Sequence, residues 1–198
     1  MSYIEYEPER EAILEVFSNF KIESYCEIGY SNGHTFDLIP CKDKLAVDPS
    51  PKRRALSHEV IEKTSDDFFS ENTKNFDCFF IDGDHECSQV SRDVKNALKF
   101  LNDGGIIFMH DISPIDFSLV NPQGCGNTFR PFLEVRCDKK LEAFRIKDCG
   151  PYGLGLVRKG SQETIDIPDS LSSDLDFYEF MHSDLDRIMN TKSLEEIL

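Results

Sequence analysis

The sequence has 198 residues, of which 37 are acidic and 22 are basic, so its formal net charge at pH 7 is −15. A chain of this length can bury one sizeable core, and its negative charge would repel nucleic acid and most anionic membrane surfaces. These quantities indicate one globular domain and argue against a nucleic-acid-binding protein.

The cysteines and the apolar runs narrow the expected compartment. Seven cysteines without a C-x-x-C pair indicate reduced thiols rather than a disulfide framework or a zinc site. The N-terminal stretch MSYIEYEPEREAILEV is too charged for a signal sequence, and no apolar run approaches the roughly 20 residues that span a bilayer. We therefore expect a cytoplasmic protein with no membrane partner.

The first predicted elements are a helix, a strand and a glycine-containing turn. Pro8 can begin a helix, and four apolar residues then share one helix face: Ile13, Val16, Phe17 and Phe20. Residues 25–28 have the pattern of a short strand that runs into a turn at 29–33. A brief helix at 34–39 ends before Pro40, and a second strand, 44–47, ends at Asp48.

Residues 53–75 allow competing predictions. A helix over 53–62 and a weak strand over 60–63 both fit this short pattern, and the choice between them stays open. Ser65 and Asp66 precede two phenylalanines in the manner of a helix cap, so a short helix is expected to begin there.

The stretch from 76 to 111 predicts the centre of a sheet. An apolar run stops at Asp82, and a second run stops at His110 and Asp111. Between them, five apolar residues share one helix face (Val90, Val94, Ala97, Leu98 and Leu101), and the glycines at 104 and 105 are expected to end that helix. A crossover of this length makes the two strands parallel neighbours, so both acidic ends emerge at the edge where open α/β sheets bind ligands.

The next part of the chain predicts a loop, a helix and a hairpin. Residues 112–127 are rich in Pro, Gly and Ser and lack periodicity, so we expect a long mobile loop. A helix is expected at 128–135. Two strands, at 141–146 and 153–157, are separated by a turn that suits a hairpin.

Together these elements predict an α/β fold, namely a Rossmann-like, doubly wound, mostly parallel sheet of seven strands with an antiparallel last strand and helices on both faces. Residues 1–160 would form this domain. Residues 161–198 hold ten acidic and two basic side chains, a net charge of −8, and predict one amphipathic helix over 176–189. We expect this acidic tail to pack on the domain or to stay partly mobile.

The turn after the first strand is the first candidate site. Glycines let backbone N–H groups approach a ligand closely, and the start of the following helix adds donors. Alone, a strand followed by G-x-x-x-G fits a tight structural turn equally well. Asp48, 19 residues beyond Gly29, favours a binding site because its carboxylate can accept hydrogen bonds from both hydroxyls of a ribose. A plain turn residue before Pro49 is the alternative.

The motifs between residues 23 and 159 resemble the class I methyltransferases that use S-adenosylmethionine. In those enzymes an acid precedes a glycine-rich turn after the first strand, and a second acid ends the second strand. The strings TSDDFF, FDCFFIDGDH and RDVKNALKFLNDGGIIFMHD are similar to methyltransferase family 24, as are the later GNTFRPFLE and GLGLV. The IDGxH motif and the HD pair are the specific part of this resemblance. Ser31 departs from it, because many class I enzymes have a glycine there.

The resemblance implies a cofactor site. The methionine end of S-adenosylmethionine would lie along the glycine turn, the ribose on Asp48, and the adenine near Ser65 and Asp66. The implied set of cofactor-binding residues is Glu27, Gly29, Ser31, Gly33, Asp48, Ser65, Asp66 and Asp82.

The resemblance also raises the question of a metal. Related O-methyltransferases place a divalent cation at the ends of the two central strands, which implies the ligands Asp82, His110 and Asp111 here. Carboxylates suit Mg²⁺, whereas a histidine suits Mn²⁺, Fe²⁺ or Zn²⁺ better. An ordinary hydrogen-bonded histidine at a strand end fits His110 equally well, so the cation stays an open question.

Methyl transfer to a hydroxyl requires the oxygen to lose its proton as the methyl group arrives. His85, three residues after Asp82, is the candidate base, and Asp82 and Asp111 complete the expected catalytic set. The alternative is that Asp84 and His85 form a turn that caps the following helix.

The sequence therefore predicts an S-adenosylmethionine-dependent O-methyltransferase that acts on a small molecule, with a sugar or glycan precursor as the first candidate and a homo-oligomer left open. Two alternatives remain, a non-catalytic cofactor- or carbohydrate-binding protein of the same fold and an NAD-dependent oxidoreductase. The second would need glycines at Ser31 and His34. A metal-dependent hydrolase would leave the glycine turn and Asp48 unexplained.

Overall fold

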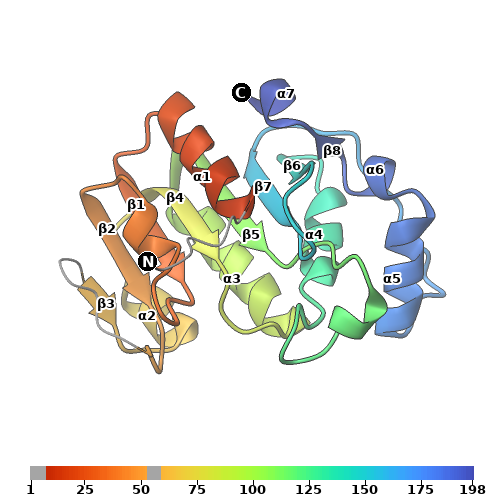
Figure 1. The fold of residues 1–198 in the computed structure, drawn as a ribbon, viewed down its shortest axis with the longest axis horizontal. Helices are drawn as coiled ribbons and strands as arrows, with labels where there is room; N and C mark the ends of the chain where they lie inside the picture. The colour runs from red at the N-terminus through yellow and green to blue at the C-terminus, as the bar shows by residue number, and fades with distance from the viewer. Residues whose placement is uncertain (1–7, 53–58) are drawn as a thin grey trace, which may run out of the picture.

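The structure is a computed structural model that describes residues 8–52 and 59–198. One sheet forms its centre, with helices on both faces (Figure 1). The strands are β1 (Ser24–Ile28), β2 (Asp43–Val47), β3 (Glu59–Ile61), β4 (Phe76–Ile81), β5 (Leu101–His110), β6 (Leu141–Ile146), β7 (Leu154–Lys159) and β8 (Thr191–Lys192). The helices are α1 (Pro8–Asn19), α2 (Ser65–Glu71), α3 (Cys87–Phe100), α4 (Phe129–Arg136), α5 (Asp174–Ser183), α6 (Leu185–Ile188) and α7 (Leu194–Ile197), with 3₁₀ turns at Phe36–Leu38 and Phe117–Leu119.

The order of the strands confirms the predicted Rossmann-like fold. The sheet runs β3-β2-β1-β4-β5-β7-β6-β8, and the first five strands in this order run parallel to one another. Strand β7 is antiparallel to both β5 and β6. The seven predicted strands are present, and the tail adds an eighth, β8, which pairs in parallel with the end of β6.

The helices divide the core into two apolar layers. On one face, α1 and α7 pack on the sheet through residues such as Ile13, Val16 and Ile197. On the other face, α2, α3, α4 and the tail helices α5 and α6 share a layer that includes Phe69, Phe132 and Met181. Because β4 is buried on both faces, its sequence is a continuous apolar run rather than an alternating one.

The crossover from β4 to β5 follows the prediction except at its end. Helix α3 buries Val90, Val94 and Ala97, but it stops at Phe100 and leads directly into β5 at Leu101. The predicted stop at the two glycines is wrong, because both lie inside the strand. A Cβ on Gly105 would lie 2.7 Å from the carbonyl oxygen of Asp77, so glycine permits a register shift there between β4 and β5.

Three other predicted helices differ in the structure. The helix expected at 34–39 is only a 3₁₀ turn of three residues, Phe36–Leu38. The first part of the helix considered for 53–62 lies outside the described residues, and residues 59–61 form β3, as the competing strand prediction required. The tail helix breaks at Asp184, whose backbone is not helical (φ −160°, ψ 70°), so α5 and α6 replace the single predicted helix.

The segment 112–127 folds against the domain. Its start is anchored to the β6–β7 hairpin by Ser113 N donating to Tyr152 O at 2.9 Å and Ile115 N donating to Pro151 O at 3.0 Å. Its centre closes on itself through Cys125 N and Leu119 O at 2.8 Å. The mobility expected of this loop stays a prediction, as does the division into a domain and a tail.

The carboxylic acid of β1 lies in the core. Glu27 is 2 % exposed and accepts a hydrogen bond from the hydroxyl of Tyr25 at 2.5 Å. Burial raises the pKa of the Glu27 carboxyl from 4.5 to about 8, although the hydrogen bond from Tyr25 opposes this shift. Glu27 therefore keeps its proton at neutral pH in the folded protein.

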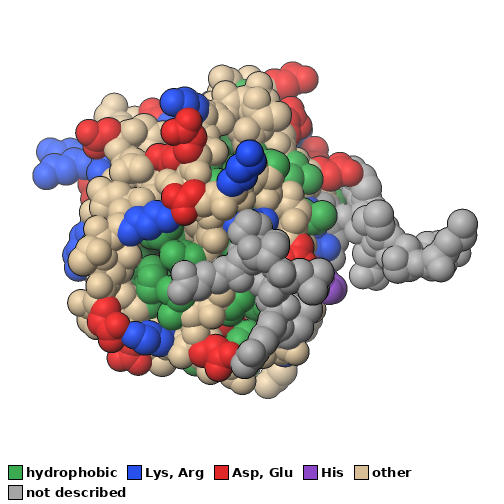
Figure 2. All heavy atoms as spheres, turned by 90° about the vertical axis from the view of Figure 1, so that its left-hand side faces the viewer, with side chains coloured by type: hydrophobic (Ala, Val, Ile, Leu, Met, Phe, Trp, Pro, Cys, Tyr) green, Lys and Arg blue, Asp and Glu red, His purple; other side chains and the backbone are tan. Residues whose placement is uncertain are grey.

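The surface charge is unevenly distributed. On the face in Figure 2, which views the left-hand side of Figure 1, basic and acidic side chains are interspersed. The tail, by contrast, carries ten acids and two bases. Among the described residues, none of the helices combines the length and the apolar character needed to cross a membrane.

Replacing Gly29 by alanine tests the close approach between β1 and β4. A Cβ there would lie 2.0 Å from the carbonyl oxygen of Asp82, at a φ of +93°. Gly104 is the matched control, because its φ is +78° and nothing lies within 4 Å of its Cβ. We expect Gly104→Ala to lower the free energy of unfolding in urea by about 1 kcal/mol and Gly29→Ala by at least ~3 kcal/mol. Equal losses would show that backbone conformation alone sets the cost.

Replacing Glu27 by glutamine tests its buried carboxyl. In the unfolded chain the acid loses its proton near pH 4.5, whereas in the folded protein it does so near pH 8, so its contribution to stability is lost as the pH rises through this window. Glutamine keeps an acceptor for Tyr25 and does not titrate. The variant should match the wild type at pH 4 and exceed it by on the order of 5 kcal/mol at pH 9 in denaturation experiments. A difference that does not change with pH would contradict this.

Candidate functional site

Two cavities open at the carboxyl ends of the parallel strands. The first encloses about 410 Å³ between the ends of β1, β2 and β4 and the starts of α2 and α3. Its walls are formed by Ile28, Gly29, Ser31, Val47, Asp48, Pro49, Thr64, Ser65, Asp82, Gly83, Asp84, Gln89 and Asp93. Four of these residues are aspartates, and the described lining contains no Lys or Arg.

The glycine turn is held between the neighbouring strands. Gly29 N donates to Val47 O of β2 at 2.8 Å, and Asp82 N donates to Ile28 O at 2.9 Å. The Asp48 carboxylate then accepts Ser31 N at 2.7 Å through one oxygen and Ser50 N at 2.7 Å through the other. These bonds fix Asp48 at the rim and leave lone pairs free on both of its oxygens.

Five of the eight predicted cofactor residues line this first cavity, namely Gly29, Ser31, Asp48, Ser65 and Asp82. The other three do not. Glu27 is buried beside Tyr25, and Gly33 packs so closely that a Cβ would overlap the Tyr30 ring. Asp66 points to the surface side, where it forms an ion pair with Arg92 at 3.4 Å.

Two further polar residues reach this cavity from α3, and the sequence analysis missed them. Asp93 is 1 % exposed and accepts Gln89 Nε2 at 3.1 Å, and Gln89 Nε2 also contacts Ser65 Oγ at 3.0 Å. Burial raises the pKa of Asp93 to about 6, against the hydrogen bonds from Ser65 and Gln89. Asp93 lies three residues after Val90 and four before Ala97, so it shares their apolar helix face, and Gln89 lies one turn before it. A polar residue on an apolar helix face was the signal available in the sequence.

The second cavity, of about 580 Å³, lies beside the first. It is lined by Ser31, Asp82, Gly83, His85, His110, Asp111, Leu119, Asn121, Gln123, Gly124 and Tyr152. Ser31, Asp82 and Gly83 belong to both cavities. Two molecules bound in them would meet at Asp82.

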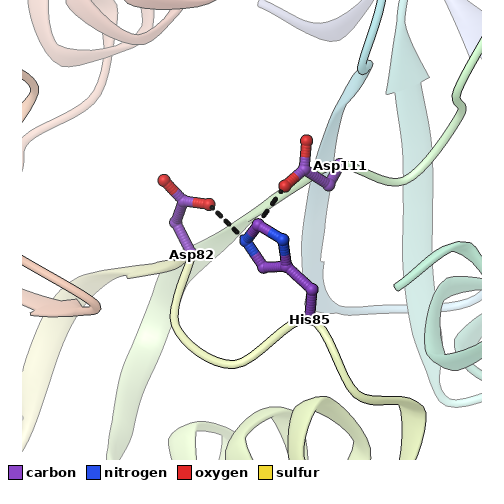
Figure 3. A group of neighbouring side chains, drawn as sticks. All are labelled: Asp82, His85 and Asp111. Atoms are coloured by element: carbon purple, nitrogen blue, oxygen red, sulfur yellow. Dashed lines mark ion pairs between the residues drawn. The ribbon is translucent and has the colours of Figure 1, made fainter. Parts of the chain in front are cut away.

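The ends of β4 and β5 bring two carboxylates and two imidazoles together. Figure 3 shows His85 directed at both acids, with Nε2 at 3.6 Å from Asp82 Oδ1 and 3.2 Å from Asp111 Oδ2. His110 Nδ1 lies 3.2 Å from Asp82 Oδ1 and 3.3 Å from Asp111 Oδ1. Asp111 holds this place with a left-handed backbone, φ +62°. The predicted catalytic residues His85, Asp82 and Asp111 are therefore neighbours.

The ring of His85 has a defined orientation. Its Nδ1 donates to the carbonyl oxygen of Gly124, which can only accept, so Nε2 is the nitrogen that faces the carboxylates. His85 does not cap the following helix. That role belongs to Glu86, whose side chain accepts Ser88 N at 2.9 Å and Gln89 N at 3.3 Å.

Three of these side chains have pKa values that their neighbours shift. The hydrogen bond with Asp82, helped by the charge of Asp111, raises the pKa of His85 to about 9 despite partial burial. Burial alone would raise the pKa of Asp82, but the charge and hydrogen bond of His110 outweigh it and lower the value to about 2. His110 has a raised pKa as well, because the nearby Asp82 charge overcomes its burial. At neutral pH His85 is thus protonated and Asp82 is ionised, so these two side chains form an ion pair.

The donors of this cluster fit a divalent cation. Asp82, His85 and Asp111 each offer one ligand atom, and these atoms lie within 4.8 Å of one another. The carbonyl that fixes His85 Nδ1 is the kind of outer contact that orients metal-binding histidines. The predicted ligand set had His110 in place of His85. His110 instead lies alongside, with Nδ1 near both carboxylates.

Comparisons with known proteins bear on the family and the fold of the chain. The family model described as a methyltransferase domain, methyltransferase family 24, matches residues 26–112. Among curated proteins, no sequence matches the chain.

Several solved structures share the fold at low sequence identity. Cofactor-bound Rv0187 from MTB has a TM-score of 0.61 and 15 % identity, over 79 % of this chain and 82 % of that one. The O-methyltransferase TomG from Streptomyces achromogenes, in complex with SAM, gives 0.57 and 14 %, over 76 % and 78 %. An O-methyltransferase from Bacillus cereus, in complex with SAH, gives 0.54 and 16 %, over 80 % and 94 %.

The family model covers β1 to the end of β5, which is the part of the chain that forms the first cavity and the acidic cluster. The shared fold extends this likeness over about four-fifths of the chain. Residues 26–112 are therefore similar to the family 24 methyltransferase domain, and the chain shares the fold of these solved methyltransferases.

Proposed function

We propose that this protein transfers a methyl group from S-adenosylmethionine to a hydroxyl group of a small molecule. The observation that carries the proposal is the wall shared by the two cavities, where Asp82 belongs to both and His85 lies on the acceptor side. The solved structures of similar fold that hold SAM or SAH support the choice of cofactor.

In this proposal the first cavity binds the adenosyl part of the cofactor. The ribose hydroxyls would bond to Asp48, and the adenine would lie toward Ser65, Gln89 and Asp93. The methionine end would follow the turn at Gly29 and Ser31. Glu27 and Gly33 would support that turn without touching the cofactor, and Asp66 would lie outside the cavity. The sulfonium would then face Asp82.

The charge of the cavity favours this cofactor over a dinucleotide. S-adenosylmethionine carries a positive sulfonium, which the carboxylates of Asp48, Asp82, Asp84 and Asp93 would attract. The same carboxylates would repel the pyrophosphate of NAD, and the described lining offers no Lys or Arg to offset them. We therefore set the oxidoreductase alternative aside.

The chemistry assigned to the second cavity is removal of the acceptor proton. A hydroxyl held near Asp82 would give its proton to Nε2 of His85, and Asp82 and Asp111 would stabilise the resulting imidazolium. Because Nε2 of His85 cannot bind a cation while it accepts a proton, the proposed ligands are Asp82, His110 and Asp111, whose donor atoms also lie close together. A divalent cation, when bound there, supplies Lewis acidity that lowers the pKa of the hydroxyl. Mg²⁺ or another divalent ion would suit these ligands.

The lining of the second cavity supports a polar acceptor such as a sugar or glycan precursor. Side chains with amide, carboxylate or imidazole groups outnumber the apolar Leu119 among its walls. Tyr152, which is 39 % exposed, offers a flat ring at one side. Oligomerisation and a cytoplasmic location remain predictions from the sequence.

One observation favours a non-catalytic protein of the same fold as the second candidate. A base must be neutral to accept a proton, and the carboxylates that flank His85 raise its pKa to about 9. Without a cation or an acceptor to displace the proton on His85, His85 would stay paired with the carboxylates and could not act as a base. Such a protein would bind the cofactor without turnover.

Calorimetry with S-adenosylhomocysteine tests the cofactor assignment. The wild type should bind with a micromolar dissociation constant, and Asp48→Asn should weaken binding about tenfold or more by removing a charged acceptor for the ribose. Asp103→Asn, an exposed acid far from the cavity, is the control and should not change affinity. NADH should not bind. Absence of binding at millimolar S-adenosylhomocysteine would refute the proposed function.

Methyl transfer from radiolabelled S-adenosylmethionine to a panel of sugars and phenols tests the base. We expect His85→Ala to lower transfer by about 10²-fold or more, with S-adenosylhomocysteine affinity within twofold of the wild type. His34→Ala, which removes an exposed histidine outside both cavities, is the control and should not change transfer. The same assay with chelator, then with Mg²⁺ or Mn²⁺ restored, tests the cation. Normal cofactor binding with no methylated product across the panel would favour the non-catalytic candidate.

A further inference from the structure

Residues 121–127, the last part of the segment 112–127, line one side of the second cavity and contact His85 at several atoms. The carbonyl oxygen of Gly124 accepts a hydrogen bond from Nδ1 of the His85 ring. The backbone N–H of Asn127 donates to the carbonyl oxygen of His85 at 3.1 Å. Gly126 packs so tightly that a Cβ would lie 2.0 Å from the same oxygen. In addition, burial and the nearby Asp111 carboxylate raise the pKa of the Cys125 thiol, so this part of the loop also lies near a carboxylate partner of His85. The loop thus orients His85 directly.

Asn127 connects this loop to two helices. Its side-chain oxygen accepts the backbone N–H of Cys87, at the start of α3, at 2.5 Å. Its side-chain nitrogen lies 3.3 Å from Asp174 Oδ2 and 3.4 Å from Oδ1, in the first turn of α5. One residue, Asn127, therefore links the backbone of His85 and of Cys87 to Asp174 of the acidic tail.

Helix α5 is itself fixed against the loop and α4. Arg130 Nη1 donates to Asp174 Oδ1 at 2.8 Å, and its guanidinium lies 4.2 Å from the Phe177 ring centre. Tyr178 packs edge-on against Phe117 of the loop at 5.3 Å between ring centres. In Figure 1, α5 lies at the side of the molecule next to α4. These contacts make α5 the outer support of the loop.

We propose that Asp174 and Asn127 are positioning residues through which the C-terminal helix α5 holds the loop 121–127 and, with it, the orientation of His85. The reason is geometric. A carbonyl can fix an imidazole only if its own backbone stays within a few tenths of an ångström, and a loop without regular structure depends on outside anchors. The catalytic meaning of this coupling rests on the proposed function, but the coupling itself does not.

The competing explanation is that Asp174 serves α5 alone. An acid in the first turn of a helix is favourable by itself, and α5 already has a capping box formed by Ser173 and Asp176. In that case removal of Asp174 would loosen α5 and leave His85 unchanged. The two explanations differ in whether removal of Asp174 changes the environment of His85, which lies about 90 residues earlier in the sequence.

Hydrogen exchange and NMR on the full chain separate these explanations. In Asp174→Ala we expect the Asn127 and Cys87 amides to exchange at least tenfold faster than in the wild type. We also expect the solvent-protected Nδ1–H resonance of His85 to broaden or disappear. Asp174→Asn, which keeps an acceptor oxygen, should restore most of the protection, and Asn127→Ala should reproduce the loss. Glu179→Ala removes an exposed acid from the same helix and should change nothing.

The result that would overturn the proposal is faster exchange confined to α5, with Asn127, Cys87 and His85 as protected in Asp174→Ala as in Glu179→Ala. S-adenosylhomocysteine affinity, measured on the same variants, should stay within twofold of the wild type, because the first cavity has no wall from the loop or α5. If the wild type fails to bind S-adenosylhomocysteine, the proposed function fails, while the exchange data still decide the coupling.

Discussion

The close approach of the β1 turn to the end of β4 sets the geometry of both cavities. Gly29 lies against the backbone of Asp82 with no room for a side chain, so the cofactor turn and the acidic strand end share one wall. Parallel β4 and β5 then bring Asp111 to the same edge. Under the proposed function this contact would bring the two ligands together, because a methyl donor and its acceptor must meet within bonding distance along one line.

Electrostatics gives this junction its chemistry and its main constraint. The contacts between the imidazoles and the carboxylates keep His85 protonated and Asp82 ionised, so His85 is not a free base at neutral pH. A bound cation or an acceptor hydroxyl would have to change that balance for turnover. The neighbouring first cavity, lined by four aspartates, suits a cationic cofactor for the same electrostatic reason.

The sequence predicted what depends on local pattern. The apolar runs of β4 and β5, the buried face of α3 and the acids at the strand ends are read directly from periodicity, and they place Asp48, Asp82, His85 and Asp111 correctly at the sheet edge. Long-range packing could not be read in this way. Two residues of β8 pair with β6 only because the tail folds back, and Gly105 serves a register shift rather than a helix end. Asp93 looked like an ordinary helix residue until the cavity beside it was known.

A structure of the protein with S-adenosylhomocysteine tests the central claim most directly. The account predicts the ribose on Asp48, the adenine toward Ser65 and Asp93, and the sulfur at the junction beside Asp82, facing Nε2 of His85 across the second cavity. A cofactor bound elsewhere, or one whose sulfur points away from Asp82, would contradict the account.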